Sequence, residues 1–160
     1  MKAGAWTKTQ TAVILELTSE VKGKSLKLRA PIDSADLTID AAGAVLTMTI
    51  GLDRVKSGSF LLDLGIGAFL LSHGAIELLF VGSGPAGIDP LLVGGIATSG
   101  KVVVDLELEL HERESKSAEH TLEVRGTAVF DDVEVPIPGI GRLSDQTLKV
   151  WSLITMVSVG

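Results

Sequence analysis

The sequence contains no cysteine and no tyrosine, and aromatic residues make up only 4% of its 160 positions. Without cysteine the chain forms no disulfide, has no thiolate nucleophile and offers no cysteine ligand to a metal. Basic residues are also few, because 14 Lys and Arg stand against 20 Asp and Glu and leave a formal net charge of −6. This balance argues against a nucleic-acid or anionic-membrane surface, since both need clustered Lys and Arg.

A secretory signal peptide is not evident either. The residues after Met1 contain no sustained apolar run, so we expect a cytoplasmic protein. What the chain does have is apolar content, at 46% of residues with a mean hydropathy of +0.41. We therefore expect residues 1–160 to form a single domain with a large core.

One apolar segment is long enough to raise the question of a membrane span. Residues 60–81 approach the roughly 20 residues that a spanning helix needs. Asp63, His73 and Glu77 fall inside it, and a charge at bilayer depth costs about 2.5 to 3.5 kcal/mol. We expect instead a buried element of a soluble core, with a short helix at 59–72 lying over a sheet.

Period-two alternation is the dominant pattern. From Val102 to Leu110, apolar side chains alternate with a face that is mostly acidic. The same alternation occurs at 13–17, 46–52 and 122–130. Turn signals separate the runs, at 22–24, 40–43, 56–58 and 136–139. Strands with one polar face, punctuated this regularly, predict an antiparallel sandwich or a closed barrel.

The last apolar run, residues 147–159, alternates less clearly. Trp151 and Leu153 fall on the opposite parity from Leu148, Val150 and Ile154. We interpret it as a strand that is buried on both sides or packed on a partner subunit.

A glycine motif, Gly82-Ser-Gly84-Pro-Ala-Gly87, fits the spacing G-x-G-x-x-G. In dinucleotide-binding folds the third glycine opens a helix whose N-terminus holds the pyrophosphate. Here Pro90 and the pair Gly94-Gly95 follow, and inside a helix they cost about 3 and about 1 kcal/mol each. We interpret residues 82–87 as a surface loop and keep a flavin- or dinucleotide-binding protein as the alternative.

Several short motifs follow one another in a particular order. Ala5-Trp6-Thr7 precedes the first alternating run, and Val21-Lys22-Gly23 follows it. Leu52-Asp-Arg-Val-Lys-Ser-Gly58 comes after the second run, and Val124-Arg-Gly-Thr-Ala-Val-Phe-Asp131 precedes Gly139-Ile-Gly141. In this order they resemble the motifs of the YceI-like family of polyisoprenoid-binding proteins. The resemblance extends from about Trp6 to the C-terminus, with few identical residues.

The resemblance implies an all-β protein, an antiparallel, lipocalin-like, closed or nearly closed β-barrel with one or two short helices. It also implies non-enzymatic binding, storage or transport of an isoprenoid or other long-chain lipid in the barrel. Each buried methylene contributes about 0.8 kcal/mol, so apolar contact can supply affinity. About half of the expected lining residues would touch a ligand, since such residues also form ordinary core. They are Leu46, Met48, Ile50, Phe69, Phe80, Val104, Leu106, Leu108, Leu122 and Val124.

Other chemistry finds little support, and we expect no cofactor, metal or enzymatic activity. His111 shares a strand face with Glu107 and Glu109, but such groups on a polar face are usually solvated. No G-x-S-x-G nucleophile elbow is present. The remaining alternative is a filled barrel with a structural role. In that case, residues 59–72 and the face around Trp151 would form the interface of a homodimer. We expect the protein to be a homodimer.

Overall fold

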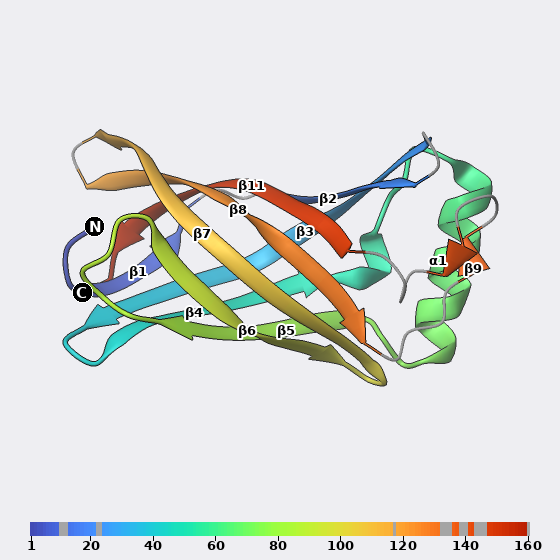
Figure 1. The fold of residues 1–160 in the computed structure, drawn as a ribbon, viewed down its shortest axis with the longest axis horizontal. Helices are drawn as coiled ribbons and strands as arrows, with labels where there is room; N and C mark the ends of the chain where they lie inside the picture. Colours follow the sequence, from blue (N-terminus) through green and yellow to red (C-terminus); the bar gives the residue numbers. More distant parts are fainter. Residues whose placement is uncertain are drawn as a thin grey trace.

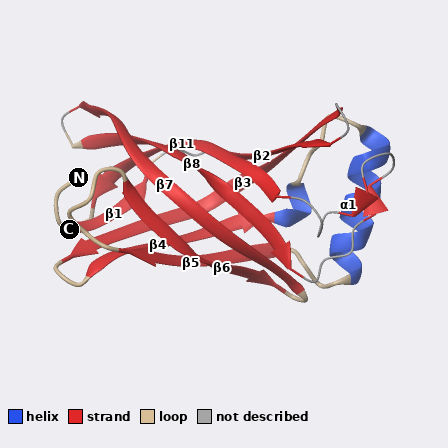
Figure 2. Ribbon diagram, in the orientation of Figure 1, coloured by secondary structure: helices blue, strands red, loops and turns tan. Residues whose placement is uncertain are grey.

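The protein folds into an antiparallel β-barrel with a helix across one end (Figures 1 and 2). The computed structural model describes residues 1–9, 13–21, 24–116, 118–131, 136–137, 141–142 and 147–159. The strands are β1 (Gly4–Lys8), β2 (Ile14–Val21), β3 (Lys24–Asp40), β4 (Gly43–Gly51), β5 (Glu77–Gly84), β6 (Leu91–Ser99), β7 (Val102–Lys116), β8 (Glu119–Asp131), β9 (Pro136–Ile137), β10 (Gly141–Arg142) and β11 (Thr147–Ser158). The helices are η1 (Leu52–Arg54) and α1 (Phe60–Ser72).

Eight of these strands close the barrel. Neighbours from β2 to β8 pair in sequence order, and β11 completes the ring by pairing with both β8 and β2. The short strand β1 adds to one end, where it pairs with β11 and β3. All these pairs are antiparallel, which confirms the expected all-β, closed antiparallel barrel. Closure leaves these eight strands without free edges.

The helix α1 begins and ends at recognisable signals. The Ser59 hydroxyl accepts a hydrogen bond from the backbone N–H of Leu62 at 3.4 Å, as an N-cap does. Asp63 accepts two bonds of 2.6 Å from the Ser57 hydroxyl and backbone N–H, and the hydroxyl bond is the main cause that lowers its pKa. Gly74, at φ +68°, follows the helix in the left-handed region. The helix expected at 59–72 is confirmed, but its expected burial is wrong, because only Ile66 and Leu70 of α1 are buried and Phe60, Leu61 and Leu71 are exposed. No helix in the described ranges has the length and apolarity needed to cross a membrane.

Strand β3 has no counterpart among the runs found by alternation. Its buried side chains lie at even positions as far as Ile32 and at odd positions from Ala35 onward. A β-bulge between Ile32 and Ser34 causes the change of parity. Pro31, which has no N–H to donate, lies where the partner of β3 changes from β2 toward β1. The strand therefore pairs with its neighbours along its length, but its apolar residues do not keep one parity in the sequence.

The interpretation of residues 147–159 as a strand buried on both sides is wrong. The side chains of β11 alternate strictly, with Leu148 and Ile154 inside and Trp151 and Leu153 on the outer wall. The interior parity also includes a polar residue, Ser152, which obscured the pattern in the sequence. Its hydroxyl donates to the Ile14 carbonyl at 2.8 Å, so this buried polar group is satisfied.

The interpretation of residues 82–87 as a surface loop is also wrong. Gly82 and Gly84 are not in a surface loop but in β5, and only Gly87 lies in the connection to β6. The two strands form an antiparallel hairpin in which Gly82 pairs with Gly95. The predicted turns around 22–24 and 136–141 fall largely outside the described residues.

Candidate ligand cavity

A cavity occupies the end of the barrel that α1 covers. Strands β2, β3, β4, β5, β7 and β8 contribute its walls, and α1, η1 and Val55 close it. All the side chains that line it are apolar. From α1 these are Ile66, Phe69 and Leu70. Such a surface favours hydrocarbon and offers no hydrogen-bonding group to a polar head.

The cavity is narrow in this conformation. About 60 Å³ is open to the centres of water-sized spheres. Since one water needs roughly 10 to 15 Å³ by this measure, the space corresponds to about four to six waters. A short apolar segment fits as it stands, but a long chain requires α1 or the lining side chains to move.

The predicted lining residues separate into two groups. Nine of them, all except Phe69, are buried inside the barrel. Those that border the cavity are Ile50, Phe69, Val104 and Leu106. Those that are buried without bordering it are Leu46, Met48, Phe80, Leu108, Leu122 and Val124. Contact of any of the ten with a ligand stays a prediction.

Sequence reasoning predicted Phe69 but missed the other residues of α1 and those of the first strands that line the cavity. Ile66 and Leu70 belong to a helix that is apolar on nearly every side, so no periodicity distinguishes its inner face. Ala30 lies on β3, whose bulge hides its alternation. Leu15 and Ala128 fall on the apolar side of the alternating runs at 13–17 and 122–130. This position in the pattern was the signal that could have identified them as interior residues.

The half of the barrel away from α1 is filled by large side chains. Phe80 and Met48, which are paired across β5 and β4, are fully buried, and so are Leu37 and Met156. The Phe80 ring lies where a side chain on Gly82 would begin, since a Cβ there would be 2.3 Å from the ring. The apolar interior thus has a tightly filled section beside the cavity under α1. A separate pocket of mixed polarity lies at the opposite end, where Met1, Ile39 and Leu122 are among its lining residues.

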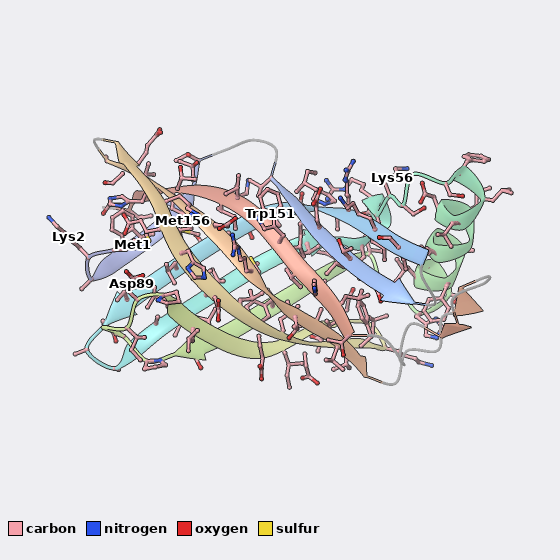
Figure 3. All side chains as sticks on the ribbon, turned by 45° about the horizontal axis from the view of Figure 1, so that its top comes forward. Met1, Lys2, Lys56, Asp89, Trp151 and Met156 are labelled. Carbon is pink, nitrogen blue, oxygen red and sulfur yellow. The ribbon has the colours of Figure 1, made fainter. Side chains whose placement is uncertain are left out.

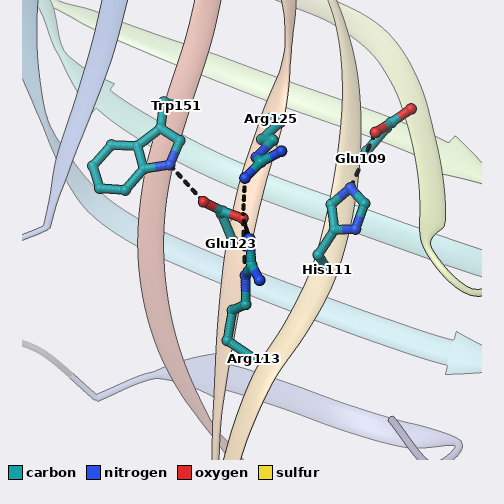
Figure 4. A network of polar contacts seen from close by, with 6 residues as sticks. All are labelled: Glu109, His111, Arg113, Glu123, Arg125 and Trp151. Atoms are coloured by element: carbon teal, nitrogen blue, oxygen red, sulfur yellow. Dashed lines mark hydrogen bonds and ion pairs between the residues drawn. The ribbon is translucent and has the colours of Figure 1, made fainter.

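A polar cluster lies on the outer wall, outside the cavity (Figure 4). Glu123 is its centre and is 8% exposed. Its carboxylate accepts from Trp151 Nε1 at 3.0 Å, from Arg113 Nε at 2.9 Å and from Arg125 Nη2 at 2.9 Å. These bonds, the one from Trp151 first, lower the pKa of Glu123 to about 2. The cluster links β7, β8 and β11 through side-chain hydrogen bonds. Its one carboxylate, that of Glu123, is engaged in these bonds.

This cluster predicts a pH dependence of stability. A lowered pKa in the folded state means that Glu123 stabilises the fold fully above its ordinary pKa of 4.5, and that the contribution is lost as the pH falls toward about 2. Wild type and Glu123→Gln should be unfolded in urea at pH 5.5 and pH 3. We expect the free energy of unfolding to fall less in the variant, because the other carboxylates are common to both proteins. An equal fall in both would contradict this assignment.

The histidines do not assemble a metal site. His111 Nε2 bonds Glu109 Oε2 at 3.0 Å, and His73 stacks on Phe69 with ring centroids 4.1 Å apart. His120 bonds Glu112 and meets the edge of the Trp6 ring. Within the described ranges, no three His, Asp or Glu side chains come together in a group that could hold a metal ion.

Comparison with solved structures identifies the fold. BcnA from Burkholderia cenocepacia matches with a TM-score of 0.59 and 15% identity, over 90% of this chain and 96% of its own. A polyisoprenoid-binding domain from Saccharophagus degradans, implicated in plant cell wall breakdown, matches with a TM-score of 0.56 and 11% identity, over 99% and 100%. The chain shares their fold. No protein-family model and no curated protein matches the amino-acid sequence.

The shared fold confirms the resemblance found in the sequence at the level of architecture. At 11 to 15% identity, the two structures say nothing of which side chains bind a ligand in this chain. That question depends on the cavity itself, which the local geometry of this barrel defines.

Proposed function

We propose that the protein binds a long apolar molecule, an isoprenoid or a fatty acyl chain, in the cavity beneath α1. The observation that carries the proposal is the lining, which is wholly apolar and lies inside a closed barrel. The similarity to a polyisoprenoid-binding domain supports the same class of ligand. Binding, storage or transport would then follow without a catalytic step.

The binding mechanism follows from the small volume and from the position of α1. A chain that enters must displace Phe69, Ile66 or Leu70, which form the inner face of the helix. Gly58 and Gly74 flank α1 at φ +86° and +68°, and a Cβ at either position would meet no atom within 4 Å. Glycine adopts such positive φ values without the steric cost of a side chain, so these two positions are where we place the hinges of the proposed movement. The apolar chain would replace the contacts that the helix gives up.

Dinucleotide binding has no comparable support. Gly82 and Gly84 lie in an antiparallel hairpin, and β6 follows where a phosphate-binding fold has a helix. The N–H groups of the two strands pair with each other instead of facing a ligand.

Filling the cavity should weaken ligand binding at little cost to stability. Ala30 borders the cavity, so Ala30→Leu places three more carbons into open space. We expect the affinity for a polyene fatty acid, measured by its fluorescence gain, to fall by about tenfold or more. The free energy of unfolding should change by less than about 1 kcal/mol.

The matched control is Ala97→Leu. Ala97 is fully buried opposite Phe80 and does not border the cavity. The larger side chain should therefore cost about 1 to 3 kcal/mol of stability and leave fatty-acid binding intact. Native mass spectrometry of wild type that shows no retained fatty acid or isoprenoid alcohol, together with no fluorescence gain, would refute the proposed function.

A further inference from the structure

The outer face of α1 is apolar and exposed to solvent. Phe60, Leu61 and Leu71 expose 76%, 79% and 72% of their surface, and Leu64 exposes 55%. A helix that is apolar on every side is normally buried in a protein or in a membrane. At 13 residues, α1 is too short to span a bilayer, which takes about 20. It has the length of a segment that lies within a membrane surface.

The inner face of the same helix covers the cavity. Ile66 and Leu70 are buried against the barrel, one helix diameter from the exposed leucines. Solvent lies on one side of α1 and the apolar cavity on the other. Any movement of the helix that admits a ligand therefore opens the cavity on the side where the exposed apolar side chains lie.

We propose that α1 docks on the surface of a lipid bilayer and exchanges apolar ligands between the bilayer and the cavity. This inference rests on the proposed function. With the outer face of α1 among the acyl chains, a ligand passes from the bilayer to the cavity without crossing water. Exposure of the ligand to water would cost about 0.8 kcal/mol per methylene group.

The charges around α1 fit the phosphate layer of a bilayer. Lys56 precedes the helix (Figure 3). Lys101 lies beside the end of the helix, with its backbone N–H bonded to the His73 carbonyl. Both lysines are exposed, and long basic side chains at the ends of an apolar helix can reach lipid phosphates. Asp53 and Glu77 are exposed at the same end, so the region has no strong positive field that would require anionic lipid.

A second copy of the chain is a poorer occupant of this face. A helix of 13 residues is about 20 Å long and about 10 Å wide, so its outer half presents on the order of 300 Å². A stable specific interface buries about 800 Å² on each partner. The helix also lies across one end of the barrel (Figure 1).

Flotation with phosphatidylcholine vesicles tests the proposal. We expect wild type to float with the vesicles and Leu61→Asp to reduce its partition coefficient by about tenfold or more. An acid in the first turn of α1 is compatible with the helix dipole, so the variant should fold. The matched control is Ile88→Asp, in an exposed loop at the opposite end of the barrel beside Asp89 (Figure 3). It should float like wild type.

The fatty-acid fluorescence assay separates this proposal from the proposed function. Leu61→Asp should retain fatty-acid binding while losing flotation, and Ala30→Leu should show the reverse. Wild type that binds fatty acid but does not float would overturn docking and leave the proposed function standing. Flotation of wild type without fatty-acid binding would support docking but refute the proposed function, and with it the exchange of ligand. A wild-type dimer in light scattering that Leu61→Asp dissociates would assign the helix face to a second copy and overturn docking.

Discussion

Gly84→Ala should lower the free energy of unfolding by about 3 kcal/mol, which is among the largest effects expected from one methyl group in this chain. A Cβ at this position would lie 1.6 Å from the carbonyl oxygen of Leu92 and 2.8 Å from its carbon. Both are backbone atoms of β6, so relief requires β5 and β6 to separate. The measurement is urea unfolding followed by far-ultraviolet circular dichroism.

Gly94→Ala is the matched control. It lies in the adjacent strand β6, where the nearest atoms to a new Cβ are 3.9 Å away. Alanine should be neutral or slightly stabilising there, since it restricts the unfolded chain more than glycine. Equal unfolding midpoints for the two variants would show that the strands do not approach as closely as described.

The same close approach recurs around the barrel. A Cβ on Gly95 would lie 2.1 Å from the Val81 carbonyl oxygen, and one on Gly126 would lie 1.9 Å from that of Glu107. Strands that coil tightly enough to close a barrel bring backbones together at such points, and glycine allows the approach. The G-x-G spacing of Gly82 and Gly84 thus has a structural cause.

Phe80→Ala should cost about 3 to 5 kcal/mol of stability, the range for removing a buried aromatic side chain. Phe80 is fully buried in the filled half of the barrel. The space over Gly82 would be left empty, because the neighbouring backbone cannot collapse into it. Calorimetry of both proteins measures the loss, and ligand binding should persist because Phe80 does not border the cavity.

Phe60→Ala provides the contrasting case. Phe60 exposes 76% of its surface on the outer face of α1, so its removal should change the melting temperature little and weaken vesicle binding. A large loss of stability from Phe60→Ala, or a small one from Phe80→Ala, would contradict the burial of these two rings.

The sequence predicted the barrel because most strands keep one parity from end to end. In β7, the residues from Val104 to Leu110 point alternately to core and solvent, and this is the pattern that alternation detects. Alternation could not predict β3, where a bulge reverses the parity of the buried residues. It could not predict β6 either, because Gly94 and Gly95 have no side chains to continue the alternating pattern.

The site could be predicted only in part. Parity places Val104 and Leu106 inside the barrel, but it does not tell a cavity from a filled core. That distinction depends on volumes: Ala30 and Ala128 leave space beneath α1, while Phe80 and Met48 fill the interior beside it. The cover supplied by α1 depends on tertiary packing, since its inner and outer faces are equally apolar in the sequence. The homodimer expected from the sequence stays a prediction.

Both ends of the described chain lie at the end of the barrel opposite α1 (Figure 1). A fusion partner, an affinity tag or an immobilising linker attached to either end would therefore project from the filled half of the molecule. Tethered to a chip or a bead by such a linker, the protein would present its helical end to the medium.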